Sequence, residues 1–105
     1  MKSRDAFIAI ADPTRREILD LLRDKGPMQA GDIAEKFSDT SRPGISRHLR
    51  VLRECGVVAA EKDGKAQVYS LEPLPLVKMR DGWLGRFGDM QTQSLKALRR
   101  RVEGH

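Results

Sequence analysis

The sequence predicts a mainly α-helical fold with one small β-hairpin, and three observations support this fold class. Apolar residues recur at spacings of three and four along most of the chain, which is the period of an amphipathic helix. One Asp-Gly pair, Asp63-Gly64, separates two β-prone runs, which is typical of a hairpin. Only 5% of the 105 residues are aromatic, so aliphatic side chains must build the core. This length predicts a single domain over residues 1–105.

The first part of the chain carries signals for two helices. An apolar segment at residues 7–11 fits a short amphipathic helix that ends before Pro13. Asp12 is a suitable N-cap for the next helix, because its carboxylate can accept hydrogen bonds from unpaired N–H groups of the first turn. Pro13 fits that turn, where a missing N–H has no cost. Gly26-Pro27 ends this second helix. Its apolar stripe consists of Ile18, Leu19, Leu21 and Leu22.

Two further helices follow, joined by a short polar turn at residues 38–40. The first is expected over about residues 30–37, and the second over about residues 41–54 with Ser41 as its N-cap. A helix pair joined in this way is typical of a helix-turn-helix motif. The residues expected to be buried are Ala30, Ile33, Ala34 and Phe37 in the first helix and Ile45, Leu49 and Leu52 in the second.

The hairpin is expected over about residues 57–71, directly after the second helix of this motif. A hairpin in this position is a wing, so the expected fold is a winged helix-turn-helix with about five helices. Apolar residues from about 75 to 102 then describe one long helix or two abutting ones. Gly82, Gly85 and Gly88 interrupt this pattern, each at a cost of about 1 kcal/mol relative to Ala. They mark either a bend or a close approach of another backbone, and both interpretations stay open.

The charge distribution favours a nucleic-acid-binding protein. The net charge is +5 and the pI is near 9.8. Between Thr40 and Arg53 there are four arginines and no acidic residue, a density that attracts phosphates. The alternative is an ordinary solvated helix face. The preceding helix, the turn and the wing together favour double-stranded DNA as the partner.

Helical geometry divides the polar residues of the 41–54 helix between two roles. Residues near its N-terminal half are placed to meet base edges in the major groove, because Arg can donate two hydrogen bonds to guanine and Ser suits a donor or an acceptor. Residues farther along are better placed for phosphates. The candidates for base contacts are Ser41, Arg42, Ser46 and Arg47, and those for phosphate contacts are Arg50 and Arg53.

Five more candidates for DNA contacts lie outside this helix. Arg15 and Arg16, at the start of the second helix, either clamp backbone phosphates or pair with acidic neighbours on their own helix. Lys62, Lys65 and Gln67 surround the turn of the wing. They either reach the phosphates or minor groove of flanking DNA, or they only keep the hairpin tip soluble.

His48 and Cys55 are candidates for other chemistry. His48 borders the buried stripe, and it either contacts a phosphate or packs as a hydrogen-bonded histidine; a metal ligand is disfavoured because no second ligand stands nearby. Cys55 is the single cysteine, which excludes an intrachain disulfide framework. It can act as a redox switch only if it is exposed and its thiolate is favoured, and we expect a packing residue instead. With no nucleophile–base pair and no phosphate-cradling loop, neither an enzyme nor a cofactor is expected.

Several sequence segments, in order, carry a family resemblance. These are ADPTRREILDLL at 11–22, GDIAEKF at 31–37 and ISRHLRVLRECGVV at 45–58, followed by the wing ending in VYSL and by Trp83-Leu84. Together they resemble the ArsR/SmtB family of winged-helix repressors, most closely its metal-independent, autorepressor-like members of the sporulation-delaying repressor group. The resemblance implies a homodimer whose first and last helices pack across a two-fold axis. It also implies a repressor that some signal releases from DNA.

The apolar face of the last helix is too wide to leave in water, which independently favours self-association. Trp83, Phe87 and Met90 could instead line a small-molecule pocket between subunits, but a stripe of this kind is more often dimer core. The residues expected at the dimer interface are Phe7, Ile10, Leu76, Met79, Trp83, Phe87, Met90 and Leu98.

No metal site is expected. Metal-sensing members of the family carry a cysteine pair before the reading helix, or His and Asp pairs on the last helix. This sequence has Ser38-Asp39-Thr40 at the first place, and only Asp81 and Asp89 as acids at the second. Two carboxylates without imidazole or thiolate bind transition metals poorly. Whether a small-molecule or redox effector releases the protein stays open.

The expected function is therefore sequence-specific DNA binding by a dimeric repressor. No apolar run reaches the roughly 18 residues of a membrane span, and residues 1–12 lack a signal-peptide core, so a cytoplasmic protein without membrane contact is expected. One alternative keeps the winged helix but makes it a protein–protein module, whose arginine-rich face meets an acidic partner in a regulatory complex.

Overall fold

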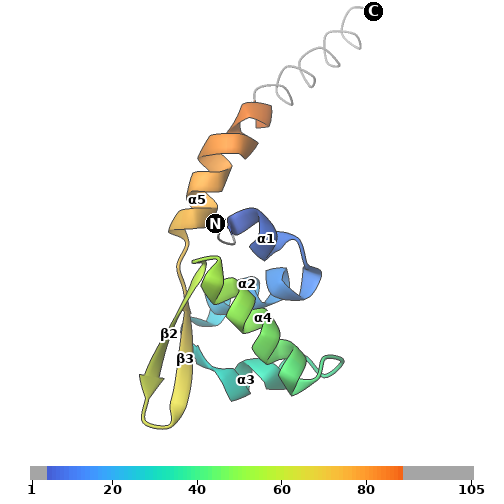
Figure 1. Cartoon of the computed structure of the whole chain (residues 1–105), viewed down its shortest axis with the longest axis vertical. Coiled ribbons are helices and arrows are strands. Elements are labelled where there is room, and N and C mark those ends of the chain that lie inside the picture. Colours follow the sequence, from blue (N-terminus) through green and yellow to red (C-terminus); the bar gives the residue numbers. More distant parts are fainter. Residues whose placement is uncertain (1–4, 89–105) are drawn as a thin grey trace, which may run out of the picture. The chain divides into compact units, whose positions relative to one another are not determined.

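The computed structural model describes residues 5–88, and the chain forms two compact units divided after Pro75. Four helices come first: α1 (Ala6–Ile10), α2 (Pro13–Lys25), α3 (Ala30–Glu35) and α4 (Arg42–Glu54). A hairpin of β2 (Val58–Asp63) and β3 (Ala66–Leu71) follows, and a two-residue strand, β1 (Met28–Gln29), precedes α3 (Figure 1). Then come α5 (Leu74–Met79) and a π-helical turn over Arg80–Leu84. The expected winged helix-turn-helix, mainly α-helical with a small sheet, is confirmed.

Two predicted caps set the start of the two longest helices. The Asp12 carboxylate accepts a hydrogen bond from the backbone N–H of Arg15 at 3.1 Å, and Pro13 occupies the first turn of α2. The Ser41 hydroxyl oxygen accepts from the N–H of Gly44, also at 3.1 Å, at the start of α4. Both helices therefore begin where the sequence predicts.

The core lies between α2, α3, α4 and the base of the hairpin. Ile45, Leu49 and Leu52, the predicted stripe of α4, are at most 1% exposed. Helix α3 ends two residues earlier than expected, and Phe37 is only half-buried. The reason is that its last turn tightens: Phe37 donates its N–H to the carbonyl of Ala34, three residues back, instead of four. The fully buried large side chains are Ile18, Leu22, Ile33, Ile45, Leu49, Leu52 and Val57.

The strands form an antiparallel sheet in the order β1-β3-β2. Asp63 pairs with Ala66, so the hairpin loop is Gly64-Lys65, one residue later than the Asp-Gly pair itself. Gly64 has φ of 66° whereas Lys65 does not have a positive φ, a combination typical of a type II′ turn. The short strand β1, which pairs Met28 with Tyr69, was not predicted. Its two residues are too few to show any alternation.

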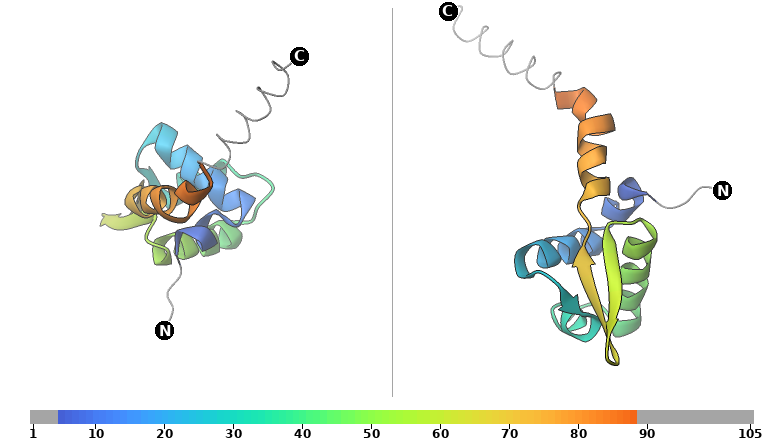
Figure 2. Two further views of the ribbon diagram at one scale, coloured as in Figure 1. Left: turned by 90° about the horizontal axis from the view of Figure 1, so that it is seen from above. Right: turned by 90° about the vertical axis from the view of Figure 1, so that its left-hand side faces the viewer.

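Helix α4 and the wing lie next to each other in the first unit. Strand β2 packs against α4, and the N-terminal end of α4 and the tip of the hairpin point toward the same end of this unit in Figures 1 and 2. Among residues 5–88 there is no helix long and apolar enough to cross a membrane.

The structure of the second unit shows why one of the three positions in the last helical segment, Gly85, needs glycine. A Cβ atom on Gly85 would lie 2.9 Å from the carbonyl oxygen of Arg80, so the π-helical turn over Arg80–Leu84 needs glycine at that position. The approaching backbone belongs to the same helix. At Gly82 and Gly88 a Cβ would meet no described atom within 4 Å. Helical structure continues to residue 88, and the remainder of the helix predicted over 75–102 lies outside the described residues.

Candidate nucleic-acid interface

The exposed face of α4 is basic and hollowed. Pro43, Ser46, Arg47 and Arg50 are all exposed and together line a surface hollow of about 410 Å³. They project away from the buried stripe of the same helix. The face therefore offers two guanidinium groups and a hydroxyl beside a concave surface.

Arg42 and Arg53 lie on the edge of this face. At 100° per residue they stand roughly 60–80° from the buried Ile45, and both are exposed. They are about 16 Å apart along the helix axis. A Cβ on Gly31 would lie 3.8 Å from the guanidinium of Arg42, so this side chain reaches over the start of α3. Ser41, the fourth residue predicted to read bases, is exposed but already accepts the capping hydrogen bond of α4.

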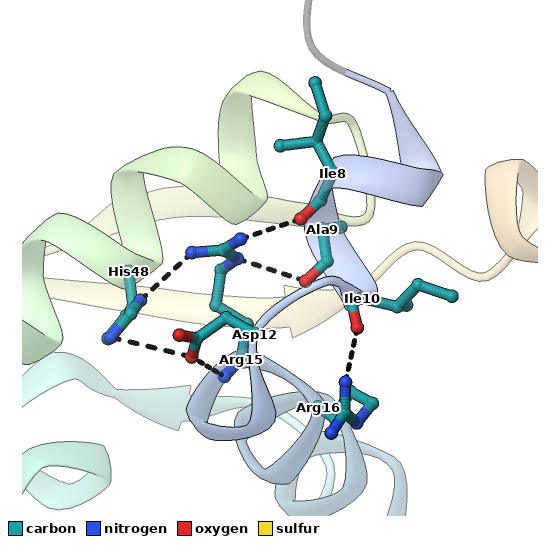
Figure 3. A network of polar contacts seen from close by, with 7 residues as sticks. All are labelled: Ile8, Ala9, Ile10, Asp12, Arg15, Arg16 and His48. Atoms are coloured by element: carbon teal, nitrogen blue, oxygen red, sulfur yellow. Dashed lines mark hydrogen bonds and ion pairs between the residues drawn. The ribbon is translucent and has the colours of Figure 1, made fainter.

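His48 is packed between helices instead of presented to solvent. Its side chain is 21% exposed. Nε2 lies 3.8 Å from a carboxylate oxygen of Asp12, and Nδ1 lies 3.4 Å from the guanidinium of Arg15 (Figure 3). Of the two interpretations that the sequence left open, the packed histidine describes this geometry.

Arg15 and Arg16 bind the end of α1. The Nε of Arg15 donates to the carbonyl of Ala9 at 3.1 Å, and its Nη2 donates to that of Ile8 at 2.7 Å. Arg16 donates to the carbonyl of Ile10 at 2.7 Å (Figure 3). The last carbonyls of a helix lack partners within it and carry a partial negative charge, so cations satisfy them well.

The sequence left two interpretations of these arginines open, a phosphate clamp or ion pairs with acids of their own helix, and in the structure their guanidinium groups bind carbonyls of α1. Asp20 pairs instead with Arg23, one turn farther along α2, at 3.1 Å. The guanidinium groups of Arg15 and Arg16 are drawn backward because the tight turn between α1 and α2 places the last carbonyls of α1 beside the first turn of α2. Nε, Nη1 and Nη2 of Arg15 all contact protein groups, whereas Arg16 is exposed and uses only Nη1.

Asp12 links the N-terminus of α2 to α4 electrostatically. Burial by itself raises the pKa of Asp12. The hydrogen bond from the N–H of Arg15, the positive charge of His48, the N–H of Thr14 and the Arg15 guanidinium all act in the opposite direction. Together they outweigh burial and hold the pKa of Asp12 below its ordinary value.

The register of the hairpin sorts the charges of the wing onto its two faces. Lys62 pairs with Gln67, and both lie on the strand face that contains the buried Val58. Glu61 and Asp63 alternate with them and therefore lie on the opposite face. Lys65 occupies the turn. The residues that were predicted to contact DNA thus share one side or the tip of the hairpin, and the acids are kept away from it.

Known proteins with similar sequences and structures share this arrangement of elements. Residues 10–60 match the model of a helix-turn-helix domain family. The transcriptional repressor SdpR of Bacillus subtilis is 51% identical over 67 residues, which cover 64% of this chain and 72% of that protein. An ArsR-like transcriptional regulator from Rhodococcus sp. RHA1 matches with a TM-score of 0.70 and 32% identity, over 94% of this chain and 88% of the other. The chain belongs to the ArsR/SmtB family of winged-helix regulators.

As a member of this family, the protein is a DNA-binding transcriptional regulator. Another relative is the arsenical resistance operon repressor of Escherichia coli, 42% identical over 67 residues, covering 64% of this chain and 56% of that protein. The resemblance that the sequence motifs indicated is confirmed, including the similarity to the sporulation-delaying repressor group.

Two further sites matter in an ArsR-family regulator. Cys55 is 6% exposed, so it packs in the core as predicted, at the end of α4. Within residues 5–88, no cluster of three or more His, Cys, Asp or Glu side chains is close enough to hold a metal ion.

Apolar side chains of this regulator are exposed on α1 and on the segment after the wing. Phe7 and Ile8 on α1 are 41% and 38% exposed, and the sequence had predicted only the first of them as an interface residue. Trp83 and Phe87 are 50% and 46% exposed, and they pack edge to face with ring centroids 4.8 Å apart. Ile10, Leu76 and Met79 are half-buried, whereas Met90 and Leu98 lie outside the described residues.

Proposed function

We propose that this ArsR-family regulator is a homodimeric repressor that reads its operator with the exposed face of α4. The observation that carries the proposal is the hollow lined by Ser46, Arg47 and Arg50, on a helix whose one acid, Glu54, is its last residue, and beside a wing whose register places Lys62 and Gln67 on the face opposite Glu61 and Asp63. This surface fits a phosphate-lined groove in both shape and charge.

The proposed division of roles follows the side chains that the fold leaves exposed. Arg47 and Ser46 contact base edges, with Arg42 at the edge of the reading face. Arg50 and Arg53 contact phosphates, and so do Lys62 and Lys65 of the wing, while Gln67 faces the adjacent groove. Ser41 serves mainly as the cap of α4. His48 and Arg15 support the interface through contacts with other protein groups, and Arg16 anchors the end of α1.

The proposed dimer forms through α1 and the last helix. Exposed aromatic side chains on both, Phe7 on α1 and Trp83 and Phe87 after the wing, supply apolar surface that a second copy would cover. Such a dimer binds two half-sites related by a two-fold axis and separated by about one helical turn of DNA or a multiple of it. Residues 1–105 act as one winged-helix domain in a cytoplasmic protein, and the releasing signal is not a transition metal.

Selection of genomic DNA fragments by the purified protein tests this function. We expect enrichment of a two-fold symmetric site near the gene of the regulator itself. Affinity for that site falls steeply with salt, because each neutralised phosphate contributes about 0.9 to the slope of log affinity against log salt. Arg47→Ala reduces specific affinity by about 10- to 100-fold and relaxes sequence preference at one position. If Arg47→Ala kept the full sequence preference of the wild type, α4 would not read the operator as proposed.

A further inference from the structure

We propose that Arg15 is a positioning residue, which ties the DNA-reading helix α4 to helix α1 through His48. The inference rests on the proposed reading role of α4. The side chain of Arg15 links three helices: it belongs to α2, donates to two carbonyls of α1 at 3.1 and 2.7 Å, and lies 3.4 Å from the ring of His48 on α4 (Figure 3).

The contact between Arg15 and His48 depends on where the ring carries its proton. Arginine has donors and no acceptor, so it can bond to Nδ1 of His48 only through the lone pair of that nitrogen, with the ring proton on Nε2. That N–H then faces the carboxylate of Asp12, 3.8 Å away. A flipped ring would instead place Cδ2–H against the guanidinium and Cε1–H against the carboxylate, and both contacts would be lost. The orientation of the His48 ring is therefore set from both sides.

Directional contacts of this kind add what the core of α4 does not supply. Ile45, Leu49 and Leu52 hold the helix against the core through apolar contacts, which depend on buried area and not on direction. Hydrogen bonds weaken steeply when distance or angle changes. The contact at His48, next in sequence to Arg47, thus limits sliding and rotation of the reading helix at the point where base contacts are proposed.

The position of α1 gives this link a regulatory consequence. Phe7 and Ile8 are exposed on α1, and the carbonyl of Ile8 is one of the two that Arg15 binds. A second copy of the chain that covers this apolar surface would restrain α1, and through Arg15 and His48 it would restrain α4. Dimer formation would in this way sharpen DNA reading without any direct contact between the interface and the DNA.

The test compares Arg15→Lys with the matched control Arg16→Lys in the full chain. Both changes keep the charge and remove a guanidinium that anchors α1, but Arg16 donates to the carbonyl of Ile10 and not to His48. The probe is a duplex selected by the wild-type protein from a random library, measured against a scrambled duplex of equal length and composition. We expect Arg15→Lys to lower the ratio of the two affinities by about tenfold, the size of one lost base contact, with an unchanged salt slope. Arg16→Lys should keep the ratio within about twofold of the wild type.

A second variant guards against simple loss of folding. His48→Gln removes the ring of α4 but leaves the bonds between Arg15 and α1 in place. It should show the same loss of discrimination at an unchanged midpoint of thermal unfolding, and the double variant should show no further loss, because both changes break one link.

Five results would overturn the inference. Equal losses in Arg15→Lys and Arg16→Lys would show general anchoring of α1, and additive losses in the double variant would show independent roles. A salt slope shallower by about 0.9 in Arg15→Lys would make Arg15 a direct phosphate contact. If both Arg15→Lys and His48→Gln kept the wild-type ratio of the two affinities, the positioning role would be excluded, but the proposed function would stand. Failure of the wild type to discriminate between the two duplexes would remove the proposed function as well.

Discussion

Lys62 and Gln67 stand directly opposite each other across β2 and β3, on the strand face marked by the buried Val58. Their nearest charged neighbours, Glu61 and Asp63, point to the other face because side chains alternate along a strand. A hairpin that reached DNA with both faces would bring these two acids toward phosphates. The register therefore supports the proposal that only the side with Lys62 and Gln67 contacts DNA.

This arrangement predicts a difference between two adjacent residues of the wing. Lys62→Ala should weaken operator binding and make the slope of log affinity against log salt shallower by about 0.9, since one phosphate contact is lost. Glu61→Gln, the matched change on the opposite face, should leave that slope unaltered. Binding isotherms at several salt concentrations check both, and equal slopes for Lys62→Ala and the wild type would contradict a phosphate contact at this residue.

Ser41 is predicted to stabilise α4 more than to read DNA. Its hydroxyl accepts the N–H of Gly44 at 3.1 Å, so Ser41→Ala should lower the free energy of unfolding by about 1 kcal/mol. Ser46→Ala on the exposed face of the same helix is the control, with an expected change within about 0.5 kcal/mol. Urea unfolding of the free protein measures both. A smaller loss in Ser41→Ala than in Ser46→Ala would count against the capping role.

The lowered pKa of Asp12 predicts how the stability of the folded protein depends on pH. Burial raises the pKa of this carboxyl, but the N–H of Arg15 and the charge of His48 outweigh it, so the pKa in the folded protein lies below the ordinary value of 3.8. A carboxyl with a lowered folded pKa contributes stability above its unfolded pKa, and this contribution is lost as the pH falls through the folded pKa.

Asp12→Asn isolates this contribution, because Asn is also a good N-cap but carries no charge. The wild type should be more stable than Asp12→Asn at pH 5–6, and the difference should shrink as the pH is lowered below about 4. Thermal unfolding across this range measures the difference. A gap between the two proteins that stayed constant down to pH 2 would contradict the lowered pKa.

Local chemistry explains which features the sequence predicts well. Asp12 and Ser41 cap helices through atoms three residues away, and the stripe of Ile45, Leu49 and Leu52 follows from helical period alone. The role of Arg15 does not follow from any such pattern. Its partners, the carbonyls of α1 and the ring of His48, are brought to it only by the turn after α1 and by the packing of α4. Strand β1 likewise exists because β3 lies beside it.

The π-helical turn is a second feature that required the structure, and it gives the last prediction. Gly85 allows the carbonyl oxygen of Arg80 to approach within 2.9 Å of the place where a Cβ would be. Gly85→Ala should therefore drive the turn back to α-helix. An α-helix in place of the π-helical turn would rotate Phe87 by about 100° relative to Leu76 and Met79.

This rotation should impair the proposed dimer, because it would move Phe87 relative to Leu76 and Met79, the other residues proposed for the interface. We expect sedimentation equilibrium to show at least about tenfold weaker self-association of Gly85→Ala, the effect of losing one buried aromatic contact. Gly82→Ala is the matched control: a Cβ there meets no described atom within 4 Å, so the variant should keep the dimer and gain up to about 1 kcal/mol of helix stability. If both variants associated as tightly as the wild type, the π-helical turn would have no part in setting the interface.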